Sequence, residues 1–273
     1  MLERENHSHK IGLISGEGEF PLLLAKELKK LNYYVVGITF SRTQEKKLQS
    51  MVDKVYHLYV GQLEKLIKTL KKEETKEIVF LGKIDKSLAL RLNLPDKRAL
   101  KLWQRVNNRE DNTLLKALVD ELEGEGFIVK GPAEFLKNFL VEEGIYTERE
   151  PTAREWEDIH YGIKIAKTIG ELDIGQCVVV KDKMTVAVEA MEGTDATILR
   201  GGKLRPQAVV IKISKPHQDL RLDLPVAGLR TIETLVKAKA SALALEANRT
   251  FFLQKEKAVE LANKYKISIV GVR

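Results

Sequence analysis

Cysteine is almost absent from this sequence, which has a single one, Cys177, among 273 residues. A disulfide within one chain needs two thiols and is therefore excluded. Cys177 lies in the apolar run CVVV, so we expect a buried structural thiol in a reducing compartment rather than a nucleophile. The lone cysteine and the five scattered histidines also form no zinc-binding pattern.

Long hydrophobic runs are missing as well. The sequence has no stretch of about 18 consecutive apolar residues, which a membrane-spanning helix requires. The polar start MLERENHSHK is not followed by the apolar core of a secretion signal. We therefore expect a cytoplasmic protein that does not span a membrane. The GxSxG elbow and the Walker lysine loop are also absent, which removes support for acyl-transfer triads and for the usual nucleoside-triphosphate hydrolases.

What is present is the composition of a globular protein, with 44% hydrophobic and 31% charged residues. The length of 273 residues suits two domains. The net charge of +7 favours anionic partners such as phosphates, nucleic acid or an anionic lipid surface, although a lysine-rich solvated surface explains it equally well.

Strand-like and helix-like segments alternate through the first half of the chain. Apolar runs such as IGLIS, YYVVGITF and EIVFLG are separated by amphipathic segments such as LEKLIKTLKKEE. This alternation predicts a Rossmann-like parallel sheet with crossover helices over residues 1–140. The acidic, proline-containing stretch VEEGIYTEREPT then predicts a connection to a second domain, residues 141–273.

The second half predicts another α/β domain, of separate fold. A helix ends near Gly170, and two strand-like runs flank the turn Lys181-Asp182-Lys183. The strand QAVVIKIS follows, then a helix from about Leu229, short strands ALALE and TFFLQ, a helix to Lys266 and a last strand. The stretch RGGKLRPQ, residues 200–207, is expected to be a short loop.

Two glycine-containing turns follow strands in the first half. Gly16 and Gly18 precede a predicted helix, and Gly82 and Lys83 follow EIVFL, so both turns are expected at the carboxyl ends of parallel strands, where anionic ligands bind. A turn with no ligand is the alternative for each. A nicotinamide fingerprint further requires a third glycine, where Pro21 stands, and an acid after the second strand, which ITFSR does not supply.

A denser set of charged residues lies in the second half. The segment VEAMEGTDATILR contains Glu189, Glu192, Thr194 and Asp195, and the segment KISKPHQDLRLDLP contains Lys212, Lys215, His217, Gln218, Arg221 and Asp223. Carboxylates beside cations suit phosphoryl chemistry, in which Mg²⁺ takes oxygen ligands and Lys or Arg neutralises developing charge. Simple helix capping is the alternative role for Thr194 or Asp195.

At these residues the sequence resembles the LpxI-type UDP-2,3-diacylglucosamine pyrophosphatases of bacterial lipid A synthesis. The resemblance rests on GLISGEGEFP, EDNTLLKALVDELEGEGF, the run from AKTIGELDIGQ to EGTDATILR, and KPHQDLRLDLPVAGLRTIE, which together span nearly the whole chain. It implies Mg²⁺-dependent hydrolysis of the UDP-sugar diphosphate to UMP and 2,3-diacylglucosamine 1-phosphate (lipid X), by a homodimer that contacts the inner membrane surface transiently. It leaves open which phosphorus is attacked.

The resemblance also implies roles for single residues. Asp223 of the RxDLP motif is the expected catalytic or metal-binding carboxylate, Asp195 and Glu192 complete the metal site, and Lys215 or Arg221 stabilises transition-state charge. The predicted catalytic residues are thus Asp223, Asp195 and Lys215. The predicted substrate contacts are Gly16, Gly18, Gly82, Lys83, Gln176, Thr194, Gln218 and Arg221.

Two other classes of function stay open. A Rossmann-type oxidoreductase would use the first glycine turn for a nicotinamide nucleotide. A basic RNA-binding module would use the positive charge, but basic residues are interspersed with acids and no aromatic-basic RNA-binding run occurs, so we expect no nucleic acid partner.

Overall fold

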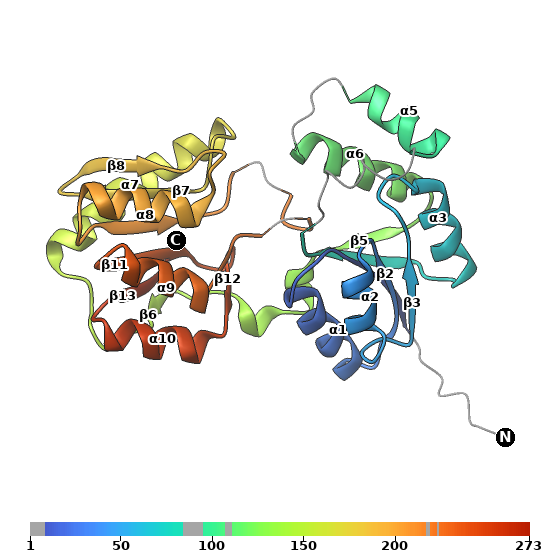
Figure 1. Ribbon diagram of the computed structural model, residues 1–273, viewed down its shortest axis with the longest axis horizontal. Coiled ribbons are helices and arrows are strands. Elements are labelled where there is room, and N and C mark those ends of the chain that lie inside the picture. Colours follow the sequence, from blue (N-terminus) through green and yellow to red (C-terminus); the bar gives the residue numbers. More distant parts are fainter. Residues whose placement is uncertain (1–8, 84–94, 107–110, 217–218, 223) are drawn as a thin grey trace. The chain divides into compact units, whose positions relative to one another are not determined.

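The computed structural model describes residues 9–83, 95–106, 111–216, 219–222 and 224–273, with only the backbone for residues 111–113. The chain forms two compact units (Figure 1). Unit 1 comprises Met1–Lys137 and Asp219–Asp223, and unit 2 comprises Asn138–Gln218 and Leu224–Arg273. The division therefore gives a short segment of the second half of the sequence to unit 1. The two domains predicted on either side of residue 140 remain a prediction.

Unit 1 contains a five-stranded, fully parallel sheet, as the sequence predicts. Its strands are β1 (Lys10–Ser15), β2 (Tyr34–Thr39), β3 (Lys54–His57), β4 (Glu77–Leu81) and β5 (Ile128–Lys130). They lie in the order β3-β2-β1-β4-β5. The chain thus builds outward from β1 to β3 and then returns to the other side of β1, which makes the β1/β4 boundary the topological switch point of the sheet.

Helices cover both faces of this sheet. They are α1 (Phe20–Lys30), α2 (Arg42–Leu48), α3 (Leu63–Lys72), α5 (Lys97–Arg105) and α6 (Asp111–Gly124), with 3-10 turns η1 (Pro132–Glu134) and η2 (Lys137–Phe139) near the end of the unit. Buried leucine and isoleucine side chains recur at helical spacing in α3, at Leu63, Leu66, Ile67 and Leu70. Together with α5 and α6, α3 packs on one face of the sheet, and α1 and α2 lie on the other (Figure 1).

Unit 2 contains a six-stranded mixed sheet. Its strands are β6 (Gly144–Ile145), β7 (Cys177–Lys181), β8 (Met184–Val188), β9 (Val209–Lys212), β11 (Ala242–Glu246) and β13 (Ser268–Val272), in the order β6-β13-β11-β9-β7-β8. Strands β9, β11 and β13 are parallel, and β7 runs antiparallel to both of its neighbours. A separate parallel pair joins β10 (Val226–Gly228) to β12 (Phe251–Leu253).

Four helices cover the two faces of this sheet. On one face α7 (Ala153–Glu171) packs on a cluster that includes Val178, Ile211 and Val270. The opposite face carries α8 (Thr194–Leu204), α9 (Leu229–Lys237) and α10 (Lys255–Lys264), over a cluster that includes Val179, Val210 and Leu243. These alternating residues follow the two-residue period of a strand. None of the described helices is both long and apolar enough to cross a bilayer.

The predicted loop at residues 200–207 is wrong, because α8 continues to Leu204. Its two glycines, which suggested a loop, are there for close packing. A Cβ on Gly201 would lie 2.7 Å from Val179 Cγ1, and one on Gly202 would lie 2.2 Å from the carbonyl oxygen of Ala238. Glycine in a helix costs about 1 kcal/mol relative to alanine, but here it lets α8 approach β7 and α9 closely.

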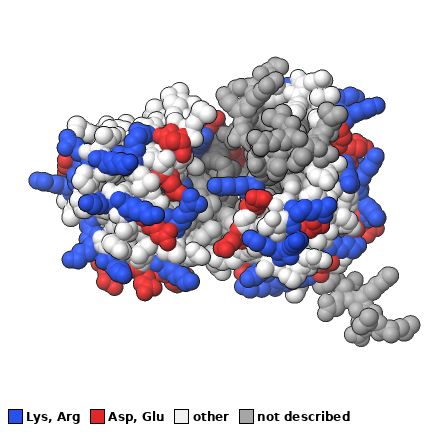
Figure 2. Space-filling view, in the orientation of Figure 1, with Lys and Arg blue, Asp and Glu red and all other residues white. Residues whose placement is uncertain are grey.

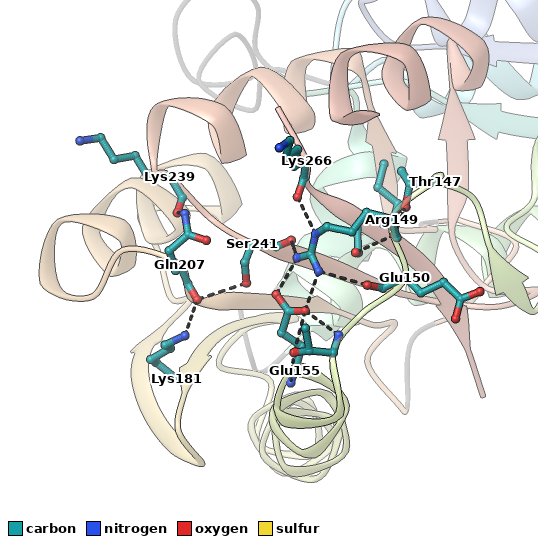
Figure 3. A network of polar contacts seen from close by, with 12 residues as sticks. Thr147, Arg149, Glu150, Glu155, Lys181, Gln207, Lys239, Ser241 and Lys266 are labelled. Atoms are coloured by element: carbon teal, nitrogen blue, oxygen red, sulfur yellow. Dashed lines mark hydrogen bonds and ion pairs between the residues drawn. The ribbon is translucent and has the colours of Figure 1, made fainter. Parts of the chain in front are cut away.

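The amino edge of the unit 2 sheet, where β9, β11 and β13 begin, is held by a dense polar network (Figure 3). The Arg149 guanidinium donates to both carboxylate oxygens of Glu155, at 2.8 and 2.7 Å, and to the carbonyl oxygens of Ser241 and Lys266, at 2.8 and 2.7 Å. Glu155 also accepts from the backbone amide of Thr152, which forms the capping box of α7. The network ties α7 to the start of β11 and the end of the α10–β13 turn.

Candidate functional site

In unit 1 the two glycine turns lie at the carboxyl ends of the neighbouring strands β1 and β4. Their backbones are bonded to each other: the amide of Gly16 donates to the carbonyl of Leu81 at 2.8 Å, and Glu17 and Lys83 exchange two backbone hydrogen bonds at 2.7 and 3.2 Å. The predicted residues Gly16, Gly82 and Lys83 are therefore brought together at the switch point of the sheet.

Close backbone contact explains two of these glycines. A Cβ on Gly16 would lie 2.5 Å from the carbonyl carbon of Gly82, and a Cβ on Gly82 would lie 2.6 Å from Pro21 Cγ. Gly82 also has a positive φ of 101°. Gly18 differs, since its φ is 115° but a Cβ placed on it would meet no described atom within 4 Å. Of the three glycines, Gly18 thus leaves open space beside the turn.

The turn is also fixed from α2. The side-chain amide of the buried Gln44 donates to the hydroxyl of Ser15 at 3.3 Å and to the carbonyl of Gly18 at 3.1 Å. The position of the third fingerprint glycine holds Pro21, which lies in the first turn of α1 and packs on Gly82, and β2 ends at Thr39 without an acid. The structure thus retains both departures from a nicotinamide fingerprint that the sequence shows, and Pro21 is part of the close packing of the turn.

In unit 2 a buried polar cluster lies at the carboxyl edge of the sheet, the edge where β8, β9 and β11 end. Lys212, the last residue of β9, and Glu189, which follows β8, are each 7% exposed. The hydroxyl of Thr194 connects them, because it donates to Glu189 Oε1 at 2.9 Å and accepts from Lys212 Nζ at 3.2 Å. Lys212 also donates to the carbonyl of Val226 at 3.0 Å.

Thr194 is not the cap of α8. The N-cap is Gly193, which has no side chain to bond and a φ of 80°, and Thr194 is the first helical residue. The alternative of a simple capping residue is therefore wrong for Thr194, whose hydroxyl is committed to Glu189 and Lys212. The free amides at the start of α8 lie beside this cluster.

The predicted contact residue Gln176 borders the same cluster, since its backbone amide donates to Glu189 Oε2 at 3.2 Å. Its neighbour Cys177 is fully buried, as the sequence predicts. Burial above all, and then the negative charge of Glu189, raise the pKa of the Cys177 thiol to about 12, while the positive charge of Lys212 opposes the shift. A thiol with that pKa is not a nucleophile near neutral pH.

Two residues that the sequence analysis did not select, Ser214 and Glu246, also lie at this edge. The amide and hydroxyl of Ser214 donate to Glu246 Oε2 at 2.7 and 2.5 Å. The signal that would have found them is their position in the sequence: Ser214 lies two residues after the apolar strand β9, and Glu246 is the last residue of the apolar strand β11. The predicted catalytic residue Lys215 forms an ion pair here with Asp173, at 2.5 Å.

The two predicted metal ligands of unit 2 have protein partners. Glu192 accepts from the Arg200 guanidinium at 2.6 Å and from the amide of Ala190 at 3.2 Å, and hydrogen bonds to its carboxylate lower its pKa. Asp195 pairs with Arg230 at 3.1 Å. Among the described residues no three carboxylate, histidine or cysteine side chains form a group that could hold a metal ion.

The RxDLP segment contributes to unit 1 as well. Arg221 forms a bidentate pair with Asp219 and donates to Glu123 of α6 at 2.7 Å, and these bonds raise the pKa of its guanidinium. Leu222 packs on the hydrophobic core of unit 1. Two predicted site residues, Gln218 and Asp223, and the neighbouring His217 lie outside the described residues.

Lys and Arg side chains are interspersed with Asp and Glu on the visible face of both units (Figure 2). Comparison with solved structures gives low similarity. A precorrin-6A reductase, CobK, matches 96% of this chain and 86% of its own at 10% identity with a TM-score of 0.30. A biotin carboxylase domain of Hydrogenobacter thermophilus 2-oxoglutarate carboxylase matches 64% of this chain and 35% of its own at 11% identity with a TM-score of 0.24. Neither value supports an argument about fold or function.

Sequence comparison is far more specific. The family model of the LpxI N-terminal domain matches residues 10–139, and that of the LpxI C-terminal domain matches residues 142–270. The UDP-2,3-diacylglucosamine pyrophosphatase LpxI of Caulobacter vibrioides is 30% identical over 281 aligned positions, which cover 96% of this chain and 97% of the relative. The two domain models and the relative agree over nearly the whole chain, and the chain belongs to the LpxI family.

Proposed function

We propose that this chain is a UDP-2,3-diacylglucosamine diphosphatase of lipid A biosynthesis. Water adds across the P–O–P bond, so that one phosphoryl group leaves as UMP and the other stays on the sugar as 2,3-diacylglucosamine 1-phosphate. The observation that carries the proposal is the full-length match to both LpxI domains and to a relative named for this activity.

The geometry of both units supports a phosphorylated substrate. Unit 1 offers a glycine turn at the switch point of a parallel sheet, where backbone amides and a helix N-terminus suit an anion. Unit 2 offers the buried Lys212 beside the start of α8. Hydrolysis of a diphosphate requires charge stabilisation of this kind, because negative charge is redistributed over the phosphoryl oxygens in the transition state.

Exposed apolar side chains near the carboxyl edge of unit 2 support a lipid substrate. Leu172, Ile174 and Met191 are 66%, 46% and 105% exposed. The loops that carry them touch, because Gly175 packs so closely on Glu189 that a Cβ would lie 2.1 Å from the Glu189 carbonyl oxygen. We extend the proposal to transient contact with the inner membrane surface and to a homodimer, which flotation with anionic vesicles and sedimentation would test.

Magnesium remains part of the proposal, with Asp223 as the central ligand or as the residue that orients water. Mg²⁺ would neutralise charge on the diphosphate. Asp195 and Glu192 would have to exchange their arginine partners for the ion, because each is paired with one in the structure.

The function is tested by incubating the protein with UDP-2,3-diacylglucosamine and Mg²⁺ and separating the products by chromatography. We expect equal amounts of UMP and the sugar 1-phosphate, and no turnover with excess EDTA. Asp223→Ala is expected to abolish turnover while substrate still binds, whereas Asp120→Ala, an exposed carboxylate of α6, keeps full activity. Absence of UMP with and without Mg²⁺ would contradict the proposed function, and full activity of Asp223→Ala would contradict the role of that residue.

A further inference from the structure

The most unusual charged group of unit 2 is the ammonium of Lys212. The residue is only 7% exposed, and its Nζ donates to two neutral acceptors, the Thr194 hydroxyl and the Val226 carbonyl. An ammonium has three N–H donors, so one is left without a protein acceptor among the described residues. A buried cation usually has a carboxylate in direct contact, because desolvation of the charge is expensive.

The two cations selected from the sequence are different. Lys215 is paired with Asp173 at 2.5 Å, and Arg221 is paired with both Asp219 and Glu123. Their charges are compensated by adjacent carboxylates. For Lys212 none of the ion pairs in the described part of the chain supplies such a partner, since the nearest acid in its network, Glu189, is reached only through Thr194.

The position of Lys212 is well determined by its neighbours. The Thr194 hydroxyl donates its hydrogen to Glu189 and accepts from Lys212 through a lone pair, and Glu189 is held in turn by the amide of Gln176. Glu189 therefore sets the direction of the Thr194 hydroxyl, and the hydroxyl sets the position of the ammonium. The charge and the spare N–H are thereby fixed beside the start of α8.

We infer that Lys212 binds a phosphoryl oxygen of the substrate's diphosphate with its third N–H, and that Thr194 and Glu189 are the positioning residues that aim it. The inference rests on the proposed function and gives a role to a cation that the sequence analysis named in its charged segment but did not select as a site residue. Lys212 contributes electrostatic stabilisation only, and no covalent bond forms or breaks at its nitrogen.

Lys212→Met tests the binding role directly. Loss of a single preorganised donor typically lowers kcat by about a hundredfold or more. We therefore expect the kcat for UMP release to fall by about that factor in Lys212→Met. We also expect loss of the heat of inorganic pyrophosphate binding in titration calorimetry with Mg²⁺ present. Lys181→Met is the matched control, because Lys181 lies on β7 of the same sheet but bonds to the Gln207 carbonyl at the amino edge. Circular dichroism verifies folding, and Lys212→Gln is used if the methionine variant does not fold.

Thr194→Val tests the positioning role. Removal of the hydroxyl is expected to lower kcat about tenfold with little change in KM, because the ammonium is still present but is no longer aimed. Thr194→Ser restores the hydroxyl and most of kcat. A purely structural role would instead lower the melting temperature of the valine variant and leave its kcat unchanged, and that result would overturn the positioning role.

The outcomes separate this inference from the proposed function. If the wild type releases UMP and Lys212→Met keeps full kcat and full pyrophosphate affinity, the inference is overturned and the proposed function stands. Absence of UMP from the wild type, with pyrophosphate binding that depends on Lys212, overturns the function and supports a phosphate site at Lys212.

Discussion

The two edges of the unit 2 sheet each hold a cation, and they differ in how fully protein groups compensate its charge. At the amino edge the Arg149 guanidinium donates two hydrogen bonds to the Glu155 carboxylate and others to backbone carbonyls (Figure 3). At the carboxyl edge Lys212 donates only to a hydroxyl and a carbonyl, although it is just 7% exposed. The first cation is saturated by protein groups, and the second retains capacity for a ligand.

The difference indicates how the two edges share stability and function. A saturated charge network fixes α7 and the strand ends but has nothing left to offer a substrate. An undersatisfied cation stabilises the fold less and binds an anion better, which is the usual relation between stability and activity at functional sites. The same substitution, a cation replaced by methionine, should therefore give opposite results at the two edges.

Arg149→Met should have the largest effect on stability. It leaves the Glu155 carboxylate buried without its partner, and breaking one side of such a pair costs roughly 3 kcal/mol, the low end of the usual range because the Arg149 side chain is 30% exposed. Urea unfolding is followed by Trp156 fluorescence in a Trp103→Phe background, which leaves one tryptophan, on α7 of unit 2. Arg154→Met, at an exposed arginine of α7, is the control. Equal stability of the two variants would refute the saturated-network interpretation.

The pH dependence of stability tests the same network without removing the arginine. Burial alone would raise the pKa of Glu155, but hydrogen bonds from Arg149, Ser241 and Thr152 lower it from 4.5 to about 2. Because the pKa of Glu155 is lower in the folded than in the unfolded chain, its ionised carboxylate stabilises the fold at any pH above the unfolded-state pKa. This contribution, roughly 3 kcal/mol, is lost as the pH falls from about 4.5 to 2. The gap in unfolding free energy between wild type and Glu155→Gln should narrow over that range. A gap independent of pH would contradict the lowered pKa.

Lys212→Met should change stability least. The lysine makes two hydrogen bonds to neutral groups, each worth about 1 kcal/mol net, and methionine relieves the desolvation of the charge. We therefore expect the unfolding free energy to change by about 1 kcal/mol or less, by the same urea and Trp156 assay. If Lys212→Met lowered the unfolding free energy as much as Arg149→Met does, the proposed difference between the two edges would be wrong.

Periodicity in the sequence predicted most of the secondary structure but missed some elements. Strands such as β1, β4 and β9 are short apolar runs, and α3 shows helical spacing, so local pattern was sufficient. The helix α2 was missed because its polar sequence RTQEKKL buries only Gln44 and Leu48, and Ser41 caps it. The strands β6 and β10 are two and three residues long and exist only because a partner strand pairs with them.

The candidate site shows the same limit. The charged segments around Thr194 and Lys212 were recognisable as sites of phosphoryl chemistry because of their residue types. The selection of Lys215 and Arg221 as cations remains untested, but the sequence could not reveal that each is paired with an acid from a distant part of the chain, Asp173 and Glu123. Pairing depends on side chains from separate elements, and spacing along the chain does not record it.

The sequence by itself determined the class of fold, the glycine turns and the family, because these depend on local pattern and on a likeness that extends over 96% of the chain at 30% identity. The tertiary structure decided which charges are compensated and which are not. It placed the ends of β8 and β9 and the start of α8 together, so that Thr194 links Glu189 to Lys212. The free energy of a charge depends on burial and on its neighbours, and both are properties of the folded chain.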